Sequence, residues 1–459
     1  MIDKILNKFL KNDPDKKCIT DSKKTYTFKE INEKIEYFSS EFKKYKKKNL
    51  GVGILLNRDV NYLSVILTCL KLKIYYVPFS RKSSKININR QIKESKVDLL
   101  ITYKNNKISF LKKKNLKSSR FNELAYIIFT SGSTGEKKAV PITYTNYSCY
   151  FKNIKNNFQK SFKSKSLIIN GEISFDIVNA DLVFALLFNC EIYITSDSNN
   201  LYELYHMIKK YKIESIYCVP STWEKIIKIW TLMDGKKINF IKQINSGGEV
   251  LTYNLFKDLE KFSPNSKKYN FYGPTEFTIN THYQKVENKK NLFHNNIATV
   301  GKLFSNISYK LVKNKKEDKF GELLLNGHQM TQGYIKSIVK PFSKINKKIY
   351  YKTGDNFFKI KDKFFYHSRL DSYIKILGYR VNLESLENKL LKTLSVNNFL
   401  YIKDLKIILV IKRVKKNKMN RVKNFINKNF EWYEKPKEIK IVNELPTLPN
   451  GKINRKYYS

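Results

Sequence analysis

The chain has 459 residues, of which 42% are hydrophobic, and it carries a formal net charge of +48. This length exceeds one ordinary core and indicates two or three domains, while the apolar content argues against wholesale disorder. No apolar run reaches the roughly 18 residues that a membrane-spanning helix needs, so we expect no membrane insertion.

The positive charge is spread along almost the whole chain. Lysines stand beside many Asn, Ile, Tyr and Phe residues, a mixture that an AT-rich coding bias favours. A nucleic-acid-binding face would instead concentrate lysine and arginine on one element and interleave aromatic side chains. The local runs at 44–48 and 110–117 are interpreted as solvated loops or helix faces. We therefore expect no specific nucleic-acid partner, and only a weaker role for the charge in attracting an acidic protein.

The N-terminus has lysines on both sides of a short apolar stretch and no small-residue cleavage site. It predicts an amphipathic first helix and no secretory signal, which indicates a cytoplasmic protein. The cysteines and histidines are scattered without the spacing of metal ligands, so we expect reduced, buried thiols and no structural zinc. The cysteines are Cys18, Cys69, Cys149, Cys190 and Cys218.

In chain order, the first 370 residues alternate short β-rich apolar runs with helical patterns. A strand is predicted at 51–56, followed by a helix at 61–72. Further strands are predicted at 75–79, 98–103, 125–130, 166–170, 191–195, 215–219 and 240–245. This order is typical of an α/β fold in which helices cross over between the strands of a mainly parallel sheet.

The pattern changes towards the C-terminus. After about residue 300 the apolar runs alternate more strictly, as at 321–327 and 363–370, which favours antiparallel strands. The stretch 371–459 has its own rhythm of strand, helix, strand, strand, helix and strand. We therefore predict a large domain at 1–370 with layered sheets, helices and a small antiparallel part, and a small α+β domain at 371–459.

The strongest local feature is the segment AYIIFTSGSTGEKKAV at 125–140. A predicted strand runs into small hydroxyl and glycine residues, whose N–H groups and hydroxyls can wrap a triphosphate. They are Thr130, Ser131, Gly132, Ser133, Thr134 and Gly135. Lys138 would add positive charge for the β- and γ-phosphates. The spacing differs from the GxxxxGK[ST] of P-loop NTPases.

This segment resembles the phosphate loop of the adenylate-forming superfamily, which includes acyl-CoA synthetases, luciferases and the amino-acid adenylation domains of nonribosomal peptide synthetases. Other segments resemble the same family in the same order, over essentially the whole chain. They are INSGGEVL (244–251), NFYGPTEFTI (270–279), GELLLNGHQMTQGY (321–334), YKTGD (351–355), HSRLDSYIKILGYRV (367–381) and LPTLPNGKINRKYY (445–458). The resemblance implies that ATP and Mg²⁺ are used to convert a carboxylic acid into an acyl-AMP, with release of pyrophosphate.

The resemblance also assigns an adenosine site. The backbone of Gly247, Gly248 and Glu249 would lie against adenine, and Tyr272 would stack on the ring. Asp355 would accept hydrogen bonds from both ribose hydroxyls. Arg369 would add a contact to the ribose or to phosphate.

A second group of residues is implied for the reaction itself. Thr275 and Glu276 would meet the α-phosphate and magnesium, a hard cation that prefers carboxylate oxygen. Lys452 would be the catalytic lysine, with Lys138 as a second positive group. Asp371 would be the hinge of a mobile C-terminal domain, which rotates to offer the acyl-AMP to a thiol, usually that of phosphopantetheine.

The stretch 173–194 resembles the amino-acid-activating branch of the family. There, Asp176 would pair with the α-ammonium group of the substrate; the alternative is that Asp176 only caps the helix that follows. Acyl- and aryl-activating relatives generally lack this carboxylate, since an unpaired buried charge is costly beside an apolar substrate. The side-chain pocket would be lined by Ile177, Ala180, Ile244, Ser246, Phe271, Ile279 and Asn280.

A bulky ring at Phe271 should shrink this pocket, which favours alanine, glycine or serine over an aromatic amino acid. The D-alanine–D-alanyl carrier protein ligases are the nearest analogy. No carrier, condensation or thioesterase motif is present, so we expect a free-standing enzyme and a phosphopantetheinylated carrier protein as a separate chain. The alternatives are an acyl- or aryl-CoA synthetase of the same fold, and a basic nucleic-acid binder or catalytically silent homologue.

The chain departs from the family pattern at several positions. Lys137 stands where proline is usual in the phosphate loop, and Ala139 where glycine is usual. Ser368 replaces the glycine before Arg369. None of these changes removes a charged catalytic group, so the resemblance still implies an active enzyme.

Overall fold

The computed structural model describes residues 1–47, 49–113, 123–131, 137–235, 237–313, 319–336, 341–370, 373–376, 378–404 and 406–446. Of Ser131, Tyr373 and Arg380 it describes the backbone. Within these ranges, no helix is long and apolar enough to cross a membrane.

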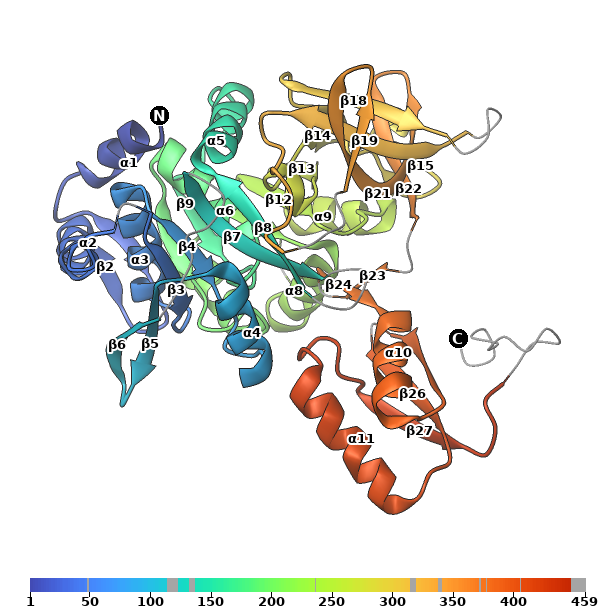
Figure 1. Cartoon of the computed structure of the whole chain (residues 1–459). Helices are drawn as coiled ribbons and strands as arrows, with labels where there is room; N and C mark the ends of the chain where they lie inside the picture. Colours follow the sequence, from blue (N-terminus) through green and yellow to red (C-terminus); the bar gives the residue numbers. More distant parts are fainter. Residues whose placement is uncertain are drawn as a thin grey trace.

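The largest sheet has nine strands and runs through the middle of the N-terminal part (Figure 1). Its spatial order is β17 (Lys302–Leu303), β14 (His282–Val286), β13 (Lys267–Tyr272), β12 (Gln243–Gly247), β11 (Ser215–Cys218), β9 (Ser166–Ile169), β10 (Glu191–Ile194), β1 (Lys17–Thr20) and β2 (Thr25–Thr27). The strands from β13 to β1 are parallel, and antiparallel strands close both edges.

A second sheet of six strands lies beside the first. Its order is β6 (Lys107–Lys112), β5 (Leu99–Lys104), β3 (Gly51–Leu55), β4 (Tyr75–Pro78), β7 (Leu124–Ser131) and β8 (Lys137–Thr143). Strands β5, β3, β4 and β7 are parallel, whereas β6 and β8 pair antiparallel at the edges.

Helices cover both faces of these sheets. They are α1 (Ile2–Leu10), α2 (Phe28–Lys43), α3 (Val60–Leu72), α4 (Lys85–Ser95), α5 (Tyr144–Phe158), α6 (Ile177–Phe188), α7 (Leu201–Tyr211), α8 (Pro220–Met233) and α9 (Tyr253–Phe262). Helices α3 and α6 are apolar on nearly all sides and almost wholly buried, as expected of helices enclosed within a core. They pack with both sheets in the main apolar core, while α7, α8 and α9 cover the other face of the nine-stranded sheet.

Strand residues alternate between these two cores. In β9, Leu167 and Ile169 belong to the main core and Ile168 to the outer one. In β11, Tyr217 faces the main core, whereas Ile216 and Cys218 face outward. This follows from the two-residue repeat of a strand and fixes which side chains reach the interior.

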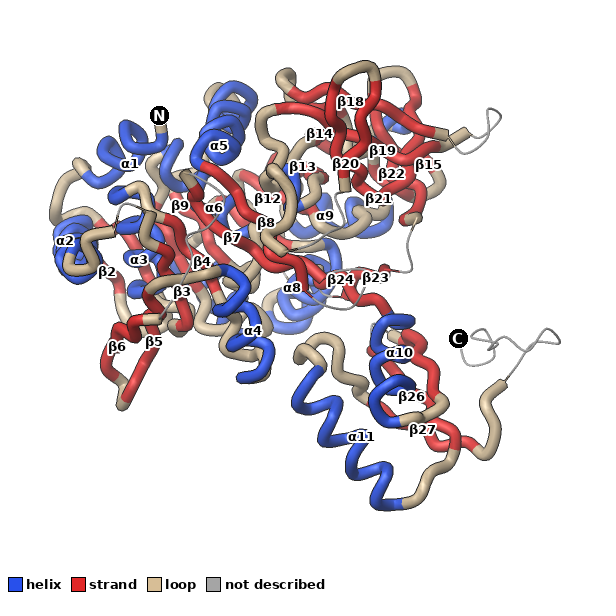
Figure 2. Tube along the Cα trace, in the orientation of Figure 1, coloured by secondary structure: helices blue, strands red, loops and turns tan. Residues whose placement is uncertain are grey.

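A strand-rich part follows the parallel sheets, and Figure 2 shows its strands gathered beside α9. It contains β18 (Ile307–Val312), β19 (Gly321–Gly327), β21 (Lys348–Ile360), β20 (Phe342–Ile345) and β22 (Lys363–Arg369), all antiparallel. Short elements connect it to the main sheet: η1 (Thr275–Phe277), η2 (Lys290–Leu292), β15 (Phe293–His294) and β16 (Ile297–Ala298).

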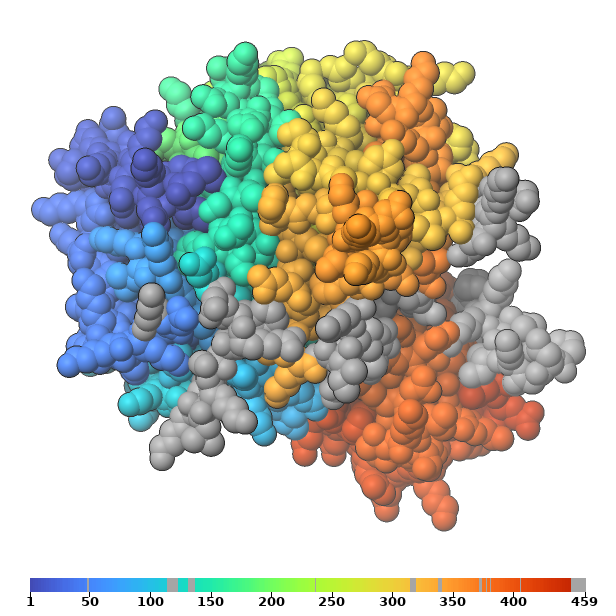
Figure 3. Space-filling view, turned by 45° about the horizontal axis from the view of Figure 1, so that its top comes forward, coloured from blue at the N-terminus to red at the C-terminus, as the bar shows by residue number. Residues whose placement is uncertain are grey.

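The C-terminal part has its own apolar core, which runs from Ile376 to Tyr433. Its elements are β23 (Tyr373–Ile376), β24 (Tyr379–Asn382), α10 (Leu383–Leu394), β25 (Asn398–Lys403), β26 (Lys406–Lys412), α11 (Lys416–Asn429) and β27 (Glu438–Val442). Figure 3 shows this small domain in orange and red, packed below the larger part. The domain boundary between residues 370 and 371 stays a proposal.

The predicted α/β fold with a small C-terminal α+β unit is confirmed. Most predicted strands lie within a residue or two of the observed ones, but β12 begins at Gln243, later than the predicted 240. Lys138 lies on a strand, β8, which the sequence analysis did not predict.

Candidate active site

The ends of four parallel strands bring the predicted residues together. Strands β9, β11, β12 and β13 are neighbours and parallel, so their carboxyl ends meet at one edge of the sheet. The segments after them carry Asp176, Gly248 and Thr275. The β7–β8 hairpin of the second sheet adds Thr130 and Lys138, which pair with each other across the strands.

A cavity of about 420 Å³ opens at this edge and extends to the antiparallel part. Its walls include Gly248, Glu249, Phe271, Tyr272, Asp355 and Arg369. All of them except Phe271 were predicted to contact ATP, although Gly248 and Arg369 are 121 positions apart in the sequence.

Asp355 is the polar centre of this cavity. Its carboxylate accepts a hydrogen bond from the Tyr272 hydroxyl at 2.6 Å and one from Arg369 Nη1 at 2.7 Å. The pairing of β21 with β22 sets Asp355 opposite Arg369, and both side chains are at least nine-tenths buried. Each carboxylate oxygen still has lone-pair capacity, so the ion pair leaves room for hydroxyl donors of a ligand.

Two glycines shape the turns beside the cavity. A Cβ at Gly273 would lie 2.2 Å from the carbonyl oxygen of Ile279, so no other residue fits without displacing the backbone. Gly248 has φ +81°, a left-handed conformation that side chains disfavour. The glycines of the two motifs are therefore required by the close approach of the chain to itself and by the turn.

A smaller cavity of about 110 Å³ adjoins the first. Among the predicted residues, its lining includes Thr130, Asp176, Ile177, Gly247, Gly248, Thr275, Ile279 and Asn280. Asp176 stands at the N-terminus of α6, but its side chain makes no capping hydrogen bond. Asp176 therefore lines the cavity without capping the helix, which favours a binding role over the capping alternative.

The four other predicted pocket residues lie elsewhere. Ala180, Ile244, Ser246 and Phe271 are buried and do not line the small cavity. Ile244 was wrongly predicted, because the two-residue repeat of β12 turns it to the core on the other face of the sheet. Phe271 borders the larger one, and its ring centroid lies 5.5 Å from that of Tyr217. Phe271 therefore packs against Tyr217, and Tyr217 lines the small cavity directly.

Tyr217 was missed by the sequence analysis. Its hydroxyl donates to Asn280 Oδ1 at 3.3 Å, and Asn280 Nδ2 donates to the Tyr150 hydroxyl at 3.0 Å. This chain of polar contacts fixes one wall of the cavity. The two-residue repeat of β11 was the available signal, because it sends Tyr217 inward.

Glu276, which is buried, and Lys138, which is half-buried, both contact Tyr334. Its side chain is 2% exposed, and Oε1 accepts from the Tyr334 hydroxyl at 2.9 Å. Oε2 is buried and has no hydrogen-bond partner among the described residues. Lys138 Nζ lies 5.1 Å from the centre of the Tyr334 ring.

A buried carboxylate oxygen without a donor is costly unless a cation or donor binds it. Glu276 therefore fits the predicted magnesium contact. In the described ranges no group of three His, Cys, Asp or Glu side chains could hold a metal, so the remaining ligands of such an ion would be phosphate oxygens and water.

Several predicted residues lie outside the described residues. They are Gly132, Ser133, Thr134 and Gly135 of the phosphate loop, the hinge residue Asp371 and the catalytic Lys452. Ser131 is described by its backbone only, as the last residue of β7.

The β23–β24 turn of the small domain reaches into the site. The N–H of Gly378 donates to Glu249 Oε1 at 2.7 Å, and the N–H of Ser221, at the start of α8, donates to Oε2 at 2.9 Å. The Tyr379 ring lies 4.2 Å from that of Phe175, measured between centroids. Glu249 thus joins a helix N-terminus, which favours negative charge, to the small domain.

A third cavity, of about 220 Å³, is also lined by Tyr379. It shares Phe175, Ile177, Tyr217, Val219 and Tyr379 with the small cavity. Its lining also includes the exposed Asn199 and the half-buried Ser198 and Lys225.

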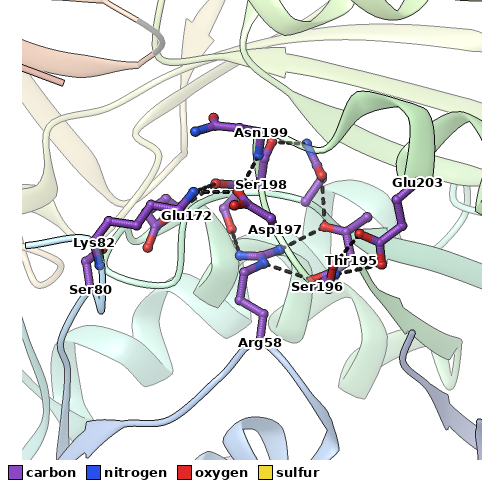
Figure 4. A network of polar contacts seen from close by, with 12 residues as sticks. Arg58, Ser80, Lys82, Glu172, Thr195, Ser196, Asp197, Ser198, Asn199 and Glu203 are labelled. Carbon is purple, nitrogen blue, oxygen red and sulfur yellow. Dashed lines mark hydrogen bonds and ion pairs between the residues drawn. The ribbon is translucent and has the colours of Figure 1, made fainter. Parts of the chain in front are cut away.

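A buried arginine holds the segment that leads to Asp176 (Figure 4). Arg58 donates to the carbonyl oxygens of Ile169 and Thr195, each at 2.9 Å, and to that of Gly171. Burial lowers the pKa of its guanidinium group. Since backbone oxygens of two strand ends surround the cation, the β9–α6 segment is tied to the end of β10.

The chain is similar to known proteins in sequence and in fold. The profile of the family described as "AMP-binding enzyme" matches residues 6–335. Bacitracin synthase 2 of Bacillus licheniformis is 27% identical over 477 residues, which cover 94% of this chain and 18% of that protein. A D-alanine–D-alanyl carrier protein ligase of Staphylococcus epidermidis is 27% identical over 499 residues, covering 98% of this chain and 97% of that one.

Solved structures share the fold at low identity. The Vibrio cholerae adenylation domain AlmE, in complex with glycyl-adenosine-5'-phosphate, superposes with a TM-score of 0.84 at 18% identity, covering 100% of this chain and 96% of that one. A nonribosomal peptide synthetase protein with adenylation and PCP domains gives 0.82 at 17% identity, covering 100% and 83%.

Proposed function

The chain belongs to the AMP-binding enzyme family and activates a carboxylic acid as its adenylate, and we propose that this acid is a small amino acid. The activated amino acid is then transferred to a carrier protein, and both reactions take place in the cytoplasm. The observation that carries the choice of acid is Asp176. It lines a cavity of only about 110 Å³ that adjoins the one of about 420 Å³, and it does not cap its helix.

The larger cavity holds the adenosine part of ATP in this proposal. Tyr272 and the backbone at Gly247, Gly248 and Glu249 contact the adenine. Asp355 accepts from the ribose hydroxyls with the lone pairs that Tyr272 and Arg369 leave available. The phosphates then lie toward Thr130 and Lys138 on the β7–β8 hairpin.

The activation step is an in-line displacement. A carboxylate oxygen of the acid bonds to the α-phosphorus of ATP, the bond from that phosphorus to the bridging oxygen breaks, and pyrophosphate leaves. Thr275, Lys138 and Lys452 position the groups and neutralise developing charge, and magnesium at Glu276 would supply further positive charge. Removing one such positive group costs on the order of 3 kcal/mol in the transition state.

The small cavity selects the acid. The Asp176 carboxylate pairs with the α-ammonium group, while Ile177, Ile279 and Tyr217 border the side chain. Because Tyr217 is held by Asn280 and backed by Phe271, the wall yields little to a larger side chain. Glycine, alanine and serine are therefore the favoured substrates.

The third cavity offers a route for the acceptor. It meets the small cavity at Tyr217 and Tyr379, so a thiol on a narrow arm reaches the acyl carbon there. The sulfur bonds to that carbon, the bond from carbon to the phosphate oxygen breaks, AMP leaves, and the thiol proton passes to solvent. The name of the ligase from Staphylococcus epidermidis supports a carrier protein as the source of this thiol.

ATP–pyrophosphate exchange over a panel of amino and fatty acids tests the proposal. We expect exchange with glycine, alanine or serine, and transfer to a phosphopantetheinylated carrier protein but not to free CoA. No exchange with any acid would refute the proposal, and efficient use of free CoA would favour an acyl- or aryl-CoA synthetase.

Asp176→Ala provides the sharper arm of the same test. Loss of a buried ion-pair partner costs about 3 kcal/mol, so kcat/KM for alanine should fall about 100-fold while that for propionate changes little. Asp15→Ala, at an exposed position, is the control and should change neither. Equal losses for both acids would mean that Asp176 is only structural.

A further inference from the structure

Glu172 is a buried carboxylate on the segment between β9 and α6, and it lines the third cavity. The residue is 6% exposed. Its Oε2 accepts a hydrogen bond from the Ser198 hydroxyl at 3.0 Å, and Lys82 Nζ lies 3.7 Å from the same oxygen (Figure 4). Among the described residues, no donor contacts Oε1. Because the oxygens of a buried carboxylate need donors, this oxygen indicates a polar ligand.

The Tyr379 hydroxyl is a second polar group of this cavity without an internal partner. Tyr379 is 5% exposed, and in the part of the chain that the structure describes its hydroxyl has no hydrogen-bond partner. The ring is held between aromatic neighbours, with its centroid 3.8 Å from that of Tyr433 and 4.2 Å from that of Phe175. Burial, and then the charge of Glu172, raise the pKa of this hydroxyl well above its ordinary value, so it stays protonated and can donate.

The two residues differ in their place along the cavity. Tyr379, like Phe175 and Tyr217, lines both the third cavity and the small one, whereas Glu172 lines the third cavity and not the small one. Glu172 therefore lies beyond the junction at which the sulfur meets the acyl carbon. The chain attached to the sulfur passes there, so Glu172 contacts the acceptor and not the acid.

The chemistry of the two groups specifies what that chain carries. A carboxylate accepts hydrogen bonds, and a protonated tyrosine hydroxyl donates one. A planar amide supplies both partners, an N–H donor and a carbonyl acceptor. A cation in the ligand is disfavoured, because Lys82 and Arg58 already place positive charge near Glu172. The pair is therefore complementary to a neutral amide, and less so to an ammonium group.

We propose that Glu172 and Tyr379 select the acyl acceptor, as a thiol whose chain carries an amide. Glu172 Oε1 accepts from the amide N–H, and the Tyr379 hydroxyl donates to the amide carbonyl. This selection rests on the proposed function, since it acts on the thiol that takes the acyl group. A thiol without the amide enters the same cavity but makes neither contact.

Two acceptors that differ in a single group test the contact with Glu172. N-Acetylcysteamine is a thiol with an amide, and 2-mercaptoethyl acetate is the matching ester, in which oxygen replaces the N–H. Single-turnover transfer from preformed alanyl-AMP should be about tenfold faster to the amide in the wild type, and Glu172→Ala should reduce this preference to less than about twofold. Because the preference is a ratio measured on one enzyme, partial unfolding of a variant does not alter it.

Tyr379→Phe removes the hydroxyl donor and keeps the ring. Since the amide and the ester both have a carbonyl group, transfer to each should fall about fivefold relative to transfer to 1-butanethiol. Glu33→Ala, at an exposed carboxylate on α2, is the control and should keep the wild-type preference for the amide.

Equal transfer to the amide and the ester in the wild type, or an unchanged preference in Glu172→Ala, would overturn the selection. A preference for cysteamine over N-acetylcysteamine that Glu172→Ala abolishes would also overturn it, because the carboxylate would then bind an ammonium group. Failure of the proposed function appears separately, as absent alanine-dependent ATP–pyrophosphate exchange in the wild type.

Discussion

Asp176 and Asp181 lie five positions apart on the same helical segment and meet opposite surroundings. Asp176 faces a cavity, whereas Asp181 is enclosed by the core and its Oδ2 has no hydrogen-bond partner among the described residues. Burial raises the pKa of the Asp181 carboxyl well above its ordinary value, although Arg58 opposes this. The folded chain therefore favours the neutral acid.

We predict that Asp181→Asn raises thermal stability, and more so at higher pH. In the unfolded chain the carboxyl ionises near its ordinary pKa of 3.8, whereas the folded chain resists ionisation. Folding stability therefore falls as the pH rises from that value towards the folded pKa, by as much as about 1.4 kcal/mol per pH unit. The asparagine variant escapes this loss.

Melting temperatures of wild type and variant between pH 4 and pH 8 would check this. The two curves should meet near pH 4 and diverge above it. Asp15→Asn, at an exposed site, should stay parallel to the wild type. Parallel curves for Asp181→Asn would show that the carboxyl ionises normally in the fold.

At the scale of the secondary-structure elements, the backbone conformation of the turns determines the shape of the nucleotide site. Gly248 and Gly235 both have positive φ, +81° and +65° respectively. Gly248 lines the large cavity, whereas Gly235 follows α8 and does not line it. Comparing alanine substitutions at Gly248 and Gly235 therefore separates the cost of backbone strain in stability from an effect on ATP binding.

Alanine at either glycine should destabilise the fold by about 1 kcal/mol, because both positions need the left-handed conformation. Gly248→Ala should also raise KM for ATP in the exchange assay, since its methyl group enters the cavity wall. Gly235→Ala should leave KM unchanged. If both variants raise KM alike, the effect is one of stability and not of the adenine contact.

The element order was predictable from sequence because each parallel strand is a short apolar run. The clustering of Tyr272, Asp355 and Arg369 was predictable only through the family resemblance. Pairing of β21 with β22 depends on long-range register, and periodicity alone does not fix it. The two-residue repeat of β11 places Tyr217 in the interior, but it does not distinguish a tyrosine that lines a cavity from one that packs in the core.

For the whole molecule, the large fold could be predicted but the docking of the small domain could not. Contacts such as the hydrogen bond from Ser83 to Glu431 join residues 348 positions apart, and no local sequence pattern predicts them. Lys137 could be recognised in the sequence as a departure from the family pattern, but its ion pair with Glu431 could not be predicted. At such departures the family resemblance no longer predicts which contacts a residue makes, and only the three-dimensional structure shows them.

The net charge of +48 concerns the whole molecule and its partner. If the carrier protein is acidic, long-range attraction raises the rate of encounter. Salt screens this attraction beyond about 10 Å at an ionic strength of 0.1 M and beyond about 3 Å at 1 M. We therefore expect kcat/KM for acyl transfer to an acidic phosphopantetheinylated carrier protein to fall about tenfold between 0.05 and 0.5 M NaCl.

Pantetheine is the control acceptor, because it is uncharged and uses only the narrow route to the acyl carbon. Starting both reactions from preformed alanyl-AMP removes the salt dependence of ATP binding. Transfer to pantetheine should then change less than twofold over the same range. A parallel fall for both acceptors would mean that salt acts on the reacting groups or on domain docking, and that the basic surface plays no part in recruiting the carrier.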